Sequence, residues 1–199
     1  MVSMDVEQIL NHTDAIQSGH FLLASKRHSK NYVQCQKVLM RPAISMRLAS
    51  ALLQSIGNLS AIDAVIAPAI GGINWQVYLA CELAKFNQSV LGLFAEKALV
   101  DNETQFILRR GQEIQPNLRV LIAEDVVTTG QSVLKVIDLV RRHLAIPVGV
   151  ASIIDRSSSE IDFGVPLYSL LKLQIESYEA YDCQLCQQNI PLEKPGSSV

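Results

Sequence analysis

The segment RVLIAEDVVTTGQSV carries the densest set of chemically useful side chains in this sequence. Four apolar residues lead into an acidic pair, Glu124-Asp125, and two more apolar residues precede the turn Thr128-Thr129-Gly130. Adjacent carboxylates can accept hydrogen bonds from a vicinal diol, or contact a metal ion that a ligand carries. The hydroxyls of the turn, and the backbone amides that open the helix after it, suit a phosphate dianion. Together these groups predict a site for a ribose 5-phosphate.

A purely structural interpretation of this segment stays open at this point. Thr128 could cap the following helix, and the acidic pair could simply solvate the end of a strand. The sequence contains neither the G-x-x-x-x-G-K-[ST] pattern of nucleoside triphosphate binders nor the G-x-G-x-x-G pattern of dinucleotide binders. Their absence disfavours these two alternative nucleotide-binding folds.

The elements that must position this segment alternate between apolar strands and helices. We predict strands at 64–67, 89–94, 118–123, 147–154 and 167–173, and helices at 43–56, 74–86 and 130–144. Short strands that are apolar throughout are typical of a parallel sheet in an α/β fold. Ligands bind such sheets beyond the carboxyl ends of the strands, where the acidic pair lies.

The remaining segments have shorter or more polar patterns. Residues 5–17 predict a short helix, and residues 21–23 and 32–35 predict short extended pieces. Residues 95–112 are polar and charged, and predict a loop that could include a hairpin.

Composition narrows the class of protein. The chain has 199 residues, of which 49% are hydrophobic and 18% charged, with a formal net charge of -2. These values predict one folded domain and exclude a disordered chain, and they disfavour a generic nucleic-acid binder. No apolar run is long enough to span a membrane, and residues 1–14 do not have the pattern of a secretory signal. The four cysteines then favour a reducing, cytoplasmic location.

The acidic and TTG segment resembles the phosphoribosyl pyrophosphate (PRPP) signature of the type I phosphoribosyltransferases. That signature is an apolar strand, two acids, two mostly apolar residues, and then T-[TSA]-G. Further segments resemble a short bacterial and archaeal group of orotate phosphoribosyltransferases. These are SGHFLLASKRHSKNYVQC, APAIGGI at 67–73, FAEK…LRRG at 94–111, SIIDRS at 152–157, DFGVPLYSLL, and the tail YDCQLC…IPLEKPGS.

The resemblance implies a fold and a reaction. The fold would be α/β, a five-stranded parallel sheet flanked by helices, with a small N-terminal hood made of residues 1–40 and part of the C-terminal tail. All of residues 1–199 would form a single phosphoribosyltransferase domain. The reaction would convert orotate and PRPP to orotidine 5′-monophosphate and pyrophosphate in pyrimidine synthesis. The resemblance also implies Mg²⁺ carried by PRPP, with no dedicated protein ligand, and a homodimer with shared active sites.

Site residues follow from the matching segments and from their chemistry. The predicted PRPP-binding residues are Ala69, Gly71, Gly72, Glu124, Asp125, Val127, Thr128, Thr129, Gly130, Gln131 and Ser132. The predicted catalytic residues of a mobile loop are Lys97, Arg109 and Arg110, because displacing pyrophosphate requires cations around a highly anionic leaving group. The predicted orotate-binding residues are Arg156, Thr128, Lys26 and Tyr32, with Arg156 gripping the carboxylate.

Some positions depart from the family pattern. Longer members carry a lysine and a histidine in the mobile loop, roughly where this chain has Val100 and Asn102. Longer members also have a lysine in place of Gly71, whereas the short group resembles this chain there. The departures concern the rate of turnover more than the fold. Two alternatives to orotate chemistry stay open, a purine or xanthine phosphoribosyltransferase and a non-catalytic regulator that senses PRPP.

The cysteine pair Cys183-Gln-Leu-Cys186 has no ligating histidine close to it in the sequence. We expect two reduced thiols in a turn of the tail, with zinc shared across a dimer or a reversible disulfide as the alternatives. We expect His20 and His28 to be structural or surface residues.

Overall fold

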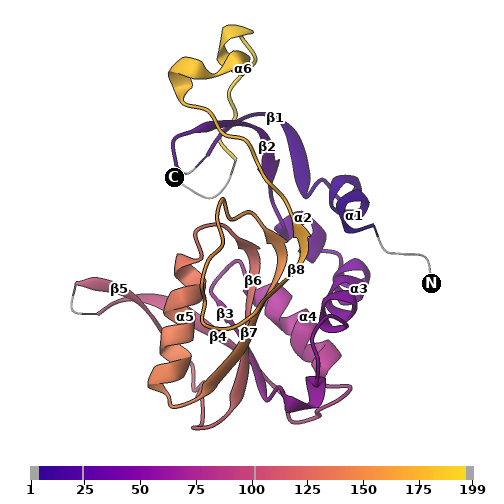
Figure 1. Ribbon diagram of the computed structural model, residues 1–199, viewed down its shortest axis with the longest axis vertical. Helices are drawn as coiled ribbons and strands as arrows, with labels where there is room; N and C mark the ends of the chain where they lie inside the picture. Colours follow the sequence, from indigo (N-terminus) through magenta and orange to yellow (C-terminus); the bar gives the residue numbers. More distant parts are fainter. Residues whose placement is uncertain (1–4, 24, 101, 196–199) are drawn as a thin grey trace. The chain divides into compact units, whose positions relative to one another are not determined.

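The computed structural model describes residues 5–23, 25–100 and 102–195 (Figure 1). The chain divides into two compact units. The smaller unit combines the residues up to Val38 with those from Leu173 onward, and the larger unit runs from Leu39 to Lys172. Of the predicted site residues, Lys26 and Tyr32 belong to the smaller unit and the others to the larger one.

One six-stranded sheet, within the described ranges, forms the centre of the larger unit. Its strands are β3 (Ala64–Pro68), β4 (Leu91–Val100), β5 (Glu103–Ile107), β6 (Arg119–Val127), β7 (Ile146–Asp155) and β8 (Leu167–Lys172). They lie in the order β5-β4-β3-β6-β7-β8. Five of these strands run parallel to one another, in the order β4-β3-β6-β7-β8, which confirms the predicted α/β fold. The sheet has a sixth strand that the five-strand prediction lacks, because β5 pairs antiparallel to β4.

Helices cover both faces of this sheet. Helices α3 (Pro42–Leu53) and α4 (Ile73–Leu83) lie on one side and α5 (Gln131–Arg142) on the other (Figure 1). The short 3-10 helix η1 (Leu59–Ala61) precedes β3. Pro42 occupies the first turn of α3, where its missing N–H costs no helical hydrogen bond. All three predicted helices of this unit are confirmed, with shifts of one to three residues at their ends.

The order of the strands reverses between β3 and β6. The chain leaves β3 through α4 to reach β4 on one side, and leaves β6 through α5 to reach β7 on the other. The helices that follow β3 and β6, two neighbouring strands, therefore lie on opposite faces of the sheet. In open α/β sheets such a reversal is where a ligand binds, beyond the carboxyl ends of the strands.

Buried contacts fix the relative position of the central strands. All five residues of β3 are buried, and the indole N–H of Trp75 in α4 donates a hydrogen bond to the Ala151 carbonyl at 3.1 Å. At the amino ends of β3 and β6, the Arg119 guanidinium donates to both oxygens of Asp63, at 3.0 and 3.1 Å. This pairing with Arg119 lowers the pKa of Asp63.

The segment 95–112, predicted as a loop that could include a hairpin, does contain a hairpin. Strand β4 continues to Val100, and β5 returns alongside it with Glu96 opposite Ile107 and Lys97 opposite Phe106. The hairpin projects away from the rest of the sheet (Figure 1). Its outward position leaves Leu99 72% exposed.

The smaller unit contains a short helix, a two-stranded sheet and a C-terminal turn. Its elements are α1 (Val6–His12), β1 (Ile16–Leu22), β2 (His28–Val33), η2 (Ala180–Asp182) and α6 (Gln184–Gln187), and α2 (Gln36–Leu39) lies at the boundary between the units. The helix predicted at 5–17 ends earlier, at His12, because Asp14 adopts a positive φ of 56° and the chain enters β1. None of the helices in the described parts of the chain is long and apolar enough to cross a membrane.

Candidate active site

The loop that follows β3 lies beside the last residues of β6 at the carboxyl edge of the sheet. Strand β6 continues to Val127, past the predicted strand end at 123, so the acidic pair lies within the strand and not beyond it. The ideal Cβ position of Gly71 lies 3.4 Å from Oδ1 of Asp125, so the predicted pyrophosphate loop adjoins the acidic pair. A Cβ on Gly72 would lie 3.0 Å from the Ala67 Cβ and 3.1 Å from the Ala123 carbonyl oxygen. The backbone at Gly72 therefore packs against the two strands as only glycine permits. The peptide bond between Ala69 and Ile70 in the same loop is cis.

The Thr128-Thr129-Gly130 turn forms a small pocket of about 50 Å³, to which Glu124 and the first residues of α5 also contribute. Gly130 has a positive φ of 70°, and a Cβ there would lie 2.8 Å from the Phe163 ring. Both facts require glycine at this position. Thr128 and Thr129 are exposed. Because the first turn of a helix leaves amides without helical acceptors, the pocket has the donors that bind a phosphate group.

The acidic pair is half-buried, which changes its protonation. Burial, followed by the negative charge of Asp125, raises the pKa of Glu124 from 4.5 to about 9. Burial also raises the pKa of Asp125, although its Oδ1 accepts a hydrogen bond from the Val126 N–H at 2.9 Å. The positive charge of Lys97 acts in the opposite sense on Glu124 and lowers its pKa. The site thus favours ligands that supply cations or hydroxyl donors to two crowded carboxyl groups.

Arg156 lies at the same edge of the sheet. It follows the last residue of β7, and its backbone N–H donates to the Val127 carbonyl at 2.7 Å, next to the TTG turn. The preceding Asp155 accepts hydrogen bonds from the Ser157 N–H and hydroxyl, at 2.9 and 2.6 Å. Lys172 forms an ion pair with the same Asp155 carboxylate at 3.6 Å. These contacts hold the strand end from which Arg156 extends.

The three predicted loop cations occupy different environments. Lys97 lies on β4 with its ammonium group 6.0 Å from the centre of the Phe106 ring, and its charge acts on Glu124. The Arg110 Nε donates to Glu96 at 2.7 Å, and this pair is mostly exposed on the arginine side. Arg109 is exposed, and its backbone carbonyl accepts from the Gln112 N–H at 3.1 Å. Among the three, Lys97 is the one whose charge the structure brings to the acidic pair.

Lys26 and Tyr32, the two predicted orotate contacts of the smaller unit, lie in or beside the β1–β2 hairpin. Lys26 adopts a positive φ of 64° in the turn between β1 and β2. The Tyr32 hydroxyl donates to Gln34 at 3.3 Å, and its ring lies 5.7 Å from that of Phe21.

The structure also brings together residues that the sequence interpretation kept apart. His20 and His28 are buried, and lie beside Cys183 and Cys186 in the smaller unit. Histidines are thus far from the cysteine pair along the sequence but close to it in the folded chain. His20 is 163 residues from Cys183, so the spacing in the sequence gave no signal that these residues would meet.

Comparison with known proteins agrees with this geometry. The family described as "Phosphoribosyl transferase domain" matches residues 34–184. An orotate phosphoribosyltransferase of Caldanaerobacter subterraneus subsp. tengcongensis is 47% identical over 192 residues, covering 96% of each chain. One of Thermotoga maritima is 41% identical and covers 96% of this chain and 97% of its own length. This chain belongs to the orotate phosphoribosyltransferase family.

Solved structures support the family's fold for this chain. The orotate phosphoribosyltransferase of Aeropyrum pernix superposes with a TM-score of 0.67, at 24% identity, over 84% of this chain and 93% of that one. An adenine phosphoribosyltransferase of Trypanosoma brucei gives a TM-score of 0.62 at 16% identity. Both orotate and adenine enzymes thus share the fold, whereas the two relatives that are 41% and 47% identical in sequence are orotate enzymes.

Proposed function

We propose that this protein transfers the phosphoribosyl group of PRPP to a ring nitrogen of orotate. The products are orotidine 5′-monophosphate, an intermediate of pyrimidine synthesis, and pyrophosphate. The observation that carries this proposal is the meeting of the acidic pair, the Gly71 loop and the TTG turn at one edge of the sheet. This arrangement offers, side by side, contacts for a ribose diol, a pyrophosphate and a 5-phosphate.

The acidic pair fits a ligand that arrives with a divalent cation. Mg²⁺ prefers oxygen ligands and keeps several of its waters, so it enters sites through one or two carboxylates plus the phosphates of a substrate. Glu124 and Asp125 would receive the ribose hydroxyls of Mg-PRPP, with the metal carried by the donor. The metal would neutralise charge on the departing pyrophosphate. Deprotonation of Glu124, disfavoured in the free protein, becomes favourable when cations and hydroxyl donors arrive.

The remaining predicted site residues would either bind the anionic groups of the substrates or close over the active site. Thr128, Thr129 and the amides at the start of α5 would bind the 5-phosphate, and the backbone at Gly71 and Gly72 the pyrophosphate. Arg156 would bind the orotate carboxylate through two parallel hydrogen bonds, with Lys26 and Tyr32 as further orotate contacts. Lys97, Arg109 and Arg110 would stabilise the leaving group from the β4–β5 hairpin and its return, where closure excludes water.

The direct test follows the loss of orotate by ultraviolet absorbance with PRPP and Mg²⁺. Adenine, guanine, hypoxanthine, xanthine and uracil are offered in parallel. We expect turnover of orotate only, and only when both PRPP and Mg²⁺ are present. Turnover of a purine instead would contradict the orotate assignment, and calorimetric binding of PRPP without turnover of any base would indicate a regulator.

We also propose a cytoplasmic homodimer in which each hairpin serves the partner's active site. Mixing an inactive Arg109→Ala protein with an inactive Asp125→Asn protein tests this. If Arg109 acts across the interface, random reassociation gives hybrid dimers with one intact site, and about a quarter of the wild-type activity returns. A mixture that stays inactive while subunit exchange is shown by mass spectrometry would contradict the shared site.

A further inference from the structure

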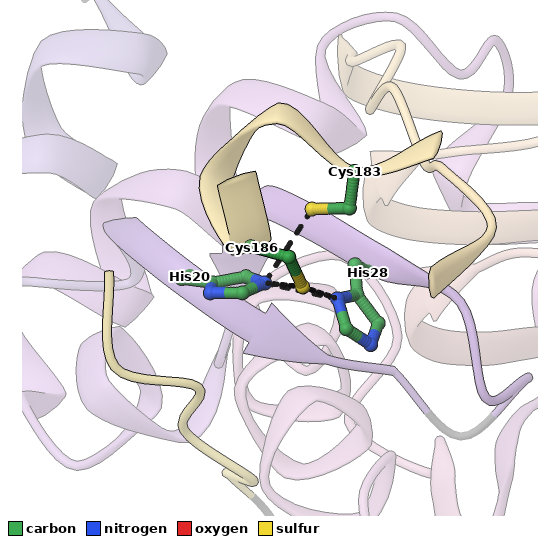
Figure 2. A group of neighbouring side chains, drawn as sticks. All are labelled: His20, His28, Cys183 and Cys186. Atoms are coloured by element: carbon green, nitrogen blue, oxygen red, sulfur yellow. Dashed lines mark hydrogen bonds between the residues drawn. The ribbon is translucent and has the colours of Figure 1, made fainter. Parts of the chain in front are cut away.

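Four ligating side chains converge in the smaller unit (Figure 2). Nε2 of His20 lies 2.9 Å from Nδ1 of His28. The sulfur of Cys183 is 3.5 Å from the same His20 nitrogen. The sulfur of Cys186 is 3.7 Å from it and 3.3 Å from Nδ1 of His28. All four candidate ligand atoms lie within 4.8 Å of one another.

These separations are close to those around a tetrahedral zinc ion. With Zn–N bonds of about 2.0–2.1 Å and Zn–S bonds of about 2.3 Å, neighbouring ligand atoms lie roughly 3.3–3.8 Å apart. The three sulfur–nitrogen distances match this range. The two nitrogens, at 2.9 Å, need to separate by only about 0.4 Å to admit the ion.

The hydrogen bond made by the other nitrogen of His20 favours a metal-binding form of that ring. Nδ1 of His20 lies 2.8 Å from the Ile190 carbonyl oxygen, which can only accept a hydrogen bond. A proton on Nδ1 leaves the lone pair of Nε2 directed at the other three side chains. Backbone carbonyls play this orienting role for zinc-bound histidines in general.

The backbone around the cluster holds its pieces in place. A bulge between Ser18 and Phe21 interrupts the pairing of β1 with β2, at the position of His20. The Glu193 N–H donates to the His20 carbonyl at 2.8 Å, and the His28 and Tyr178 backbones exchange two hydrogen bonds of 2.8 Å. The C-terminal segment is therefore bound to the hairpin on both sides of the cysteine pair.

We propose that His20, His28, Cys183 and Cys186 bind one Zn²⁺ within a single chain. Two thiolates and two imidazoles form a ligand set typical of structural zinc, and four protein ligands leave no open position for catalysis. His20 is 2% exposed, His28 5% and Cys183 0%, so three of the four residues are buried, whereas Cys186 is exposed. The ion joins the β1–β2 hairpin to the C-terminal segment, two parts of the chain that are far apart in sequence.

This assignment replaces the interpretation of the cysteines as two uncoordinated thiols. It also differs from zinc shared across a dimer, because one chain supplies all four ligands. The C-x-x-C pair begins at Cys183, the N-cap residue of α6, and Cys186 lies inside that helical turn. The turn thus directs both sulfurs to one point, as in C-x₂-C zinc sites.

Metal analysis of the full-length protein is the primary test. The chain is purified without a histidine tag or chelator, and its metal content is measured by plasma mass spectrometry. We expect one zinc per chain. One zinc per two chains would overturn the single-chain site in favour of a shared ion.

Cobalt titration covers the case in which zinc is lost during purification. The chelated and fully reduced protein is titrated with Co²⁺, and visible bands typical of tetrahedral thiolate coordination should saturate at one equivalent. Zinc should then displace the cobalt and raise the Tm by at least about 5 °C. Reduced protein that shows no such bands would overturn the proposal.

Matched variants locate the ion. Cys186→Ser and His28→Asn should lower zinc affinity by at least about 100-fold, and Cys186→His should restore part of it. The exposed Cys81 and His12 provide the controls Cys81→Ser and His12→Asn, which should keep one zinc per chain. Circular dichroism of each variant establishes that it is folded before titration. Undiminished zinc affinity in folded Cys186→Ser would place the ion elsewhere and refute the assignment.

Discussion

The carboxyl edge of the sheet and the His–Cys cluster of the smaller unit both crowd ligating side chains together, but with different donors and surroundings. The edge presents two carboxyl groups that are half-buried, on a sheet whose central strands are apolar. The cluster presents nitrogen and sulfur, three of its four residues buried, in a unit with few apolar core side chains. Oxygen donors facing an opening suit an exchanging, metal-carrying substrate, whereas closed nitrogen and sulfur donors suit a permanent ion.

The difference also concerns what holds each region together. In the larger unit, helices on both faces bury the sheet, so the edge can tolerate carboxyl groups whose pKa values are raised by burial. The described part of the smaller unit is stabilised by one hairpin and a returning tail. Small units of this kind commonly gain stability from a metal or a disulfide rather than from apolar burial. Variants of one region should therefore alter catalysis, and variants of the other should alter metal content and stability.

The largest expected effect separates the two regions directly. Asp125→Asn should lower kcat/KM by about 100- to 1000-fold, because it removes a charge and acceptor that meet the Mg-PRPP complex. The exposed Asp138 on α5 gives the control Asp138→Asn, which should retain full activity. Zinc content, measured on the same samples, should stay at one per chain in both. Loss of zinc in Asp125→Asn would break the proposed separation.

Arg156 tests whether base recognition belongs to the sheet edge. Arg156→Lys should raise the KM for orotate by about 10- to 100-fold, since a lysine cannot make two parallel hydrogen bonds to a carboxylate. The KM for PRPP should change little. Arg141→Lys, an exposed arginine of α5, is the control. Equal changes in both KM values would instead indicate a general distortion of the edge.

Gly130 tests how far the backbone of the edge tolerates change. Gly130→Ala should destabilise the protein by about 2 kcal/mol and lower the Tm by about 6 °C, because of its positive φ and the adjacent Phe163 ring. Gly57 has no atom within 4 Å of its ideal Cβ position, so Gly57→Ala should lie within about 0.5 kcal/mol of the wild type. Thermal unfolding of both variants checks the contrast. Equal Tm values would show that the TTG turn relaxes around a side chain.

Local patterns predicted the sheet edge well, because its residues are contiguous or follow apolar strands. Glu124, Asp125 and the TTG turn lie within seven residues, and the strand before them is an uninterrupted apolar run. The bounds of strand β5 could not be predicted, although a hairpin within 95–112 was left open. Phe106 is the one residue of ETQFI that is fully buried, so the strand lacks an apolar pattern. Antiparallel hydrogen bonding to β4 forms this strand, and the sequence of β5 alone does not indicate it.

The His–Cys cluster could not be predicted from spacing. Its ligands come from β1, the start of β2 and the turn at α6, and only the two cysteines of that turn share a short motif. Hydrogen bonds between the hairpin and the C-terminal segment create the cluster, and these contacts join residues more than 100 positions apart. A sequence pattern covers neighbouring residues and cannot indicate contacts between residues so far apart.

The smallest expected effect concerns the pH dependence that the acidic pair gives to the free protein. Glu124 has a pKa raised from 4.5 to about 9, so between these values the folded protein holds a proton that the unfolded chain has released. Stability contributed by the neutral form is therefore present at acidic pH and falls as the pH rises toward 9. Glu124→Gln cannot ionise, and should unfold at a higher temperature than the wild type at pH 8 but at the same temperature as the wild type at pH 4. Thermal unfolding across this range, with the exposed Glu103→Gln as the control, measures the difference. A Tm difference that does not change with pH would mean that Glu124 is already ionised in the free protein. Water would then reach this carboxyl group well enough to offset the burial of its side chain.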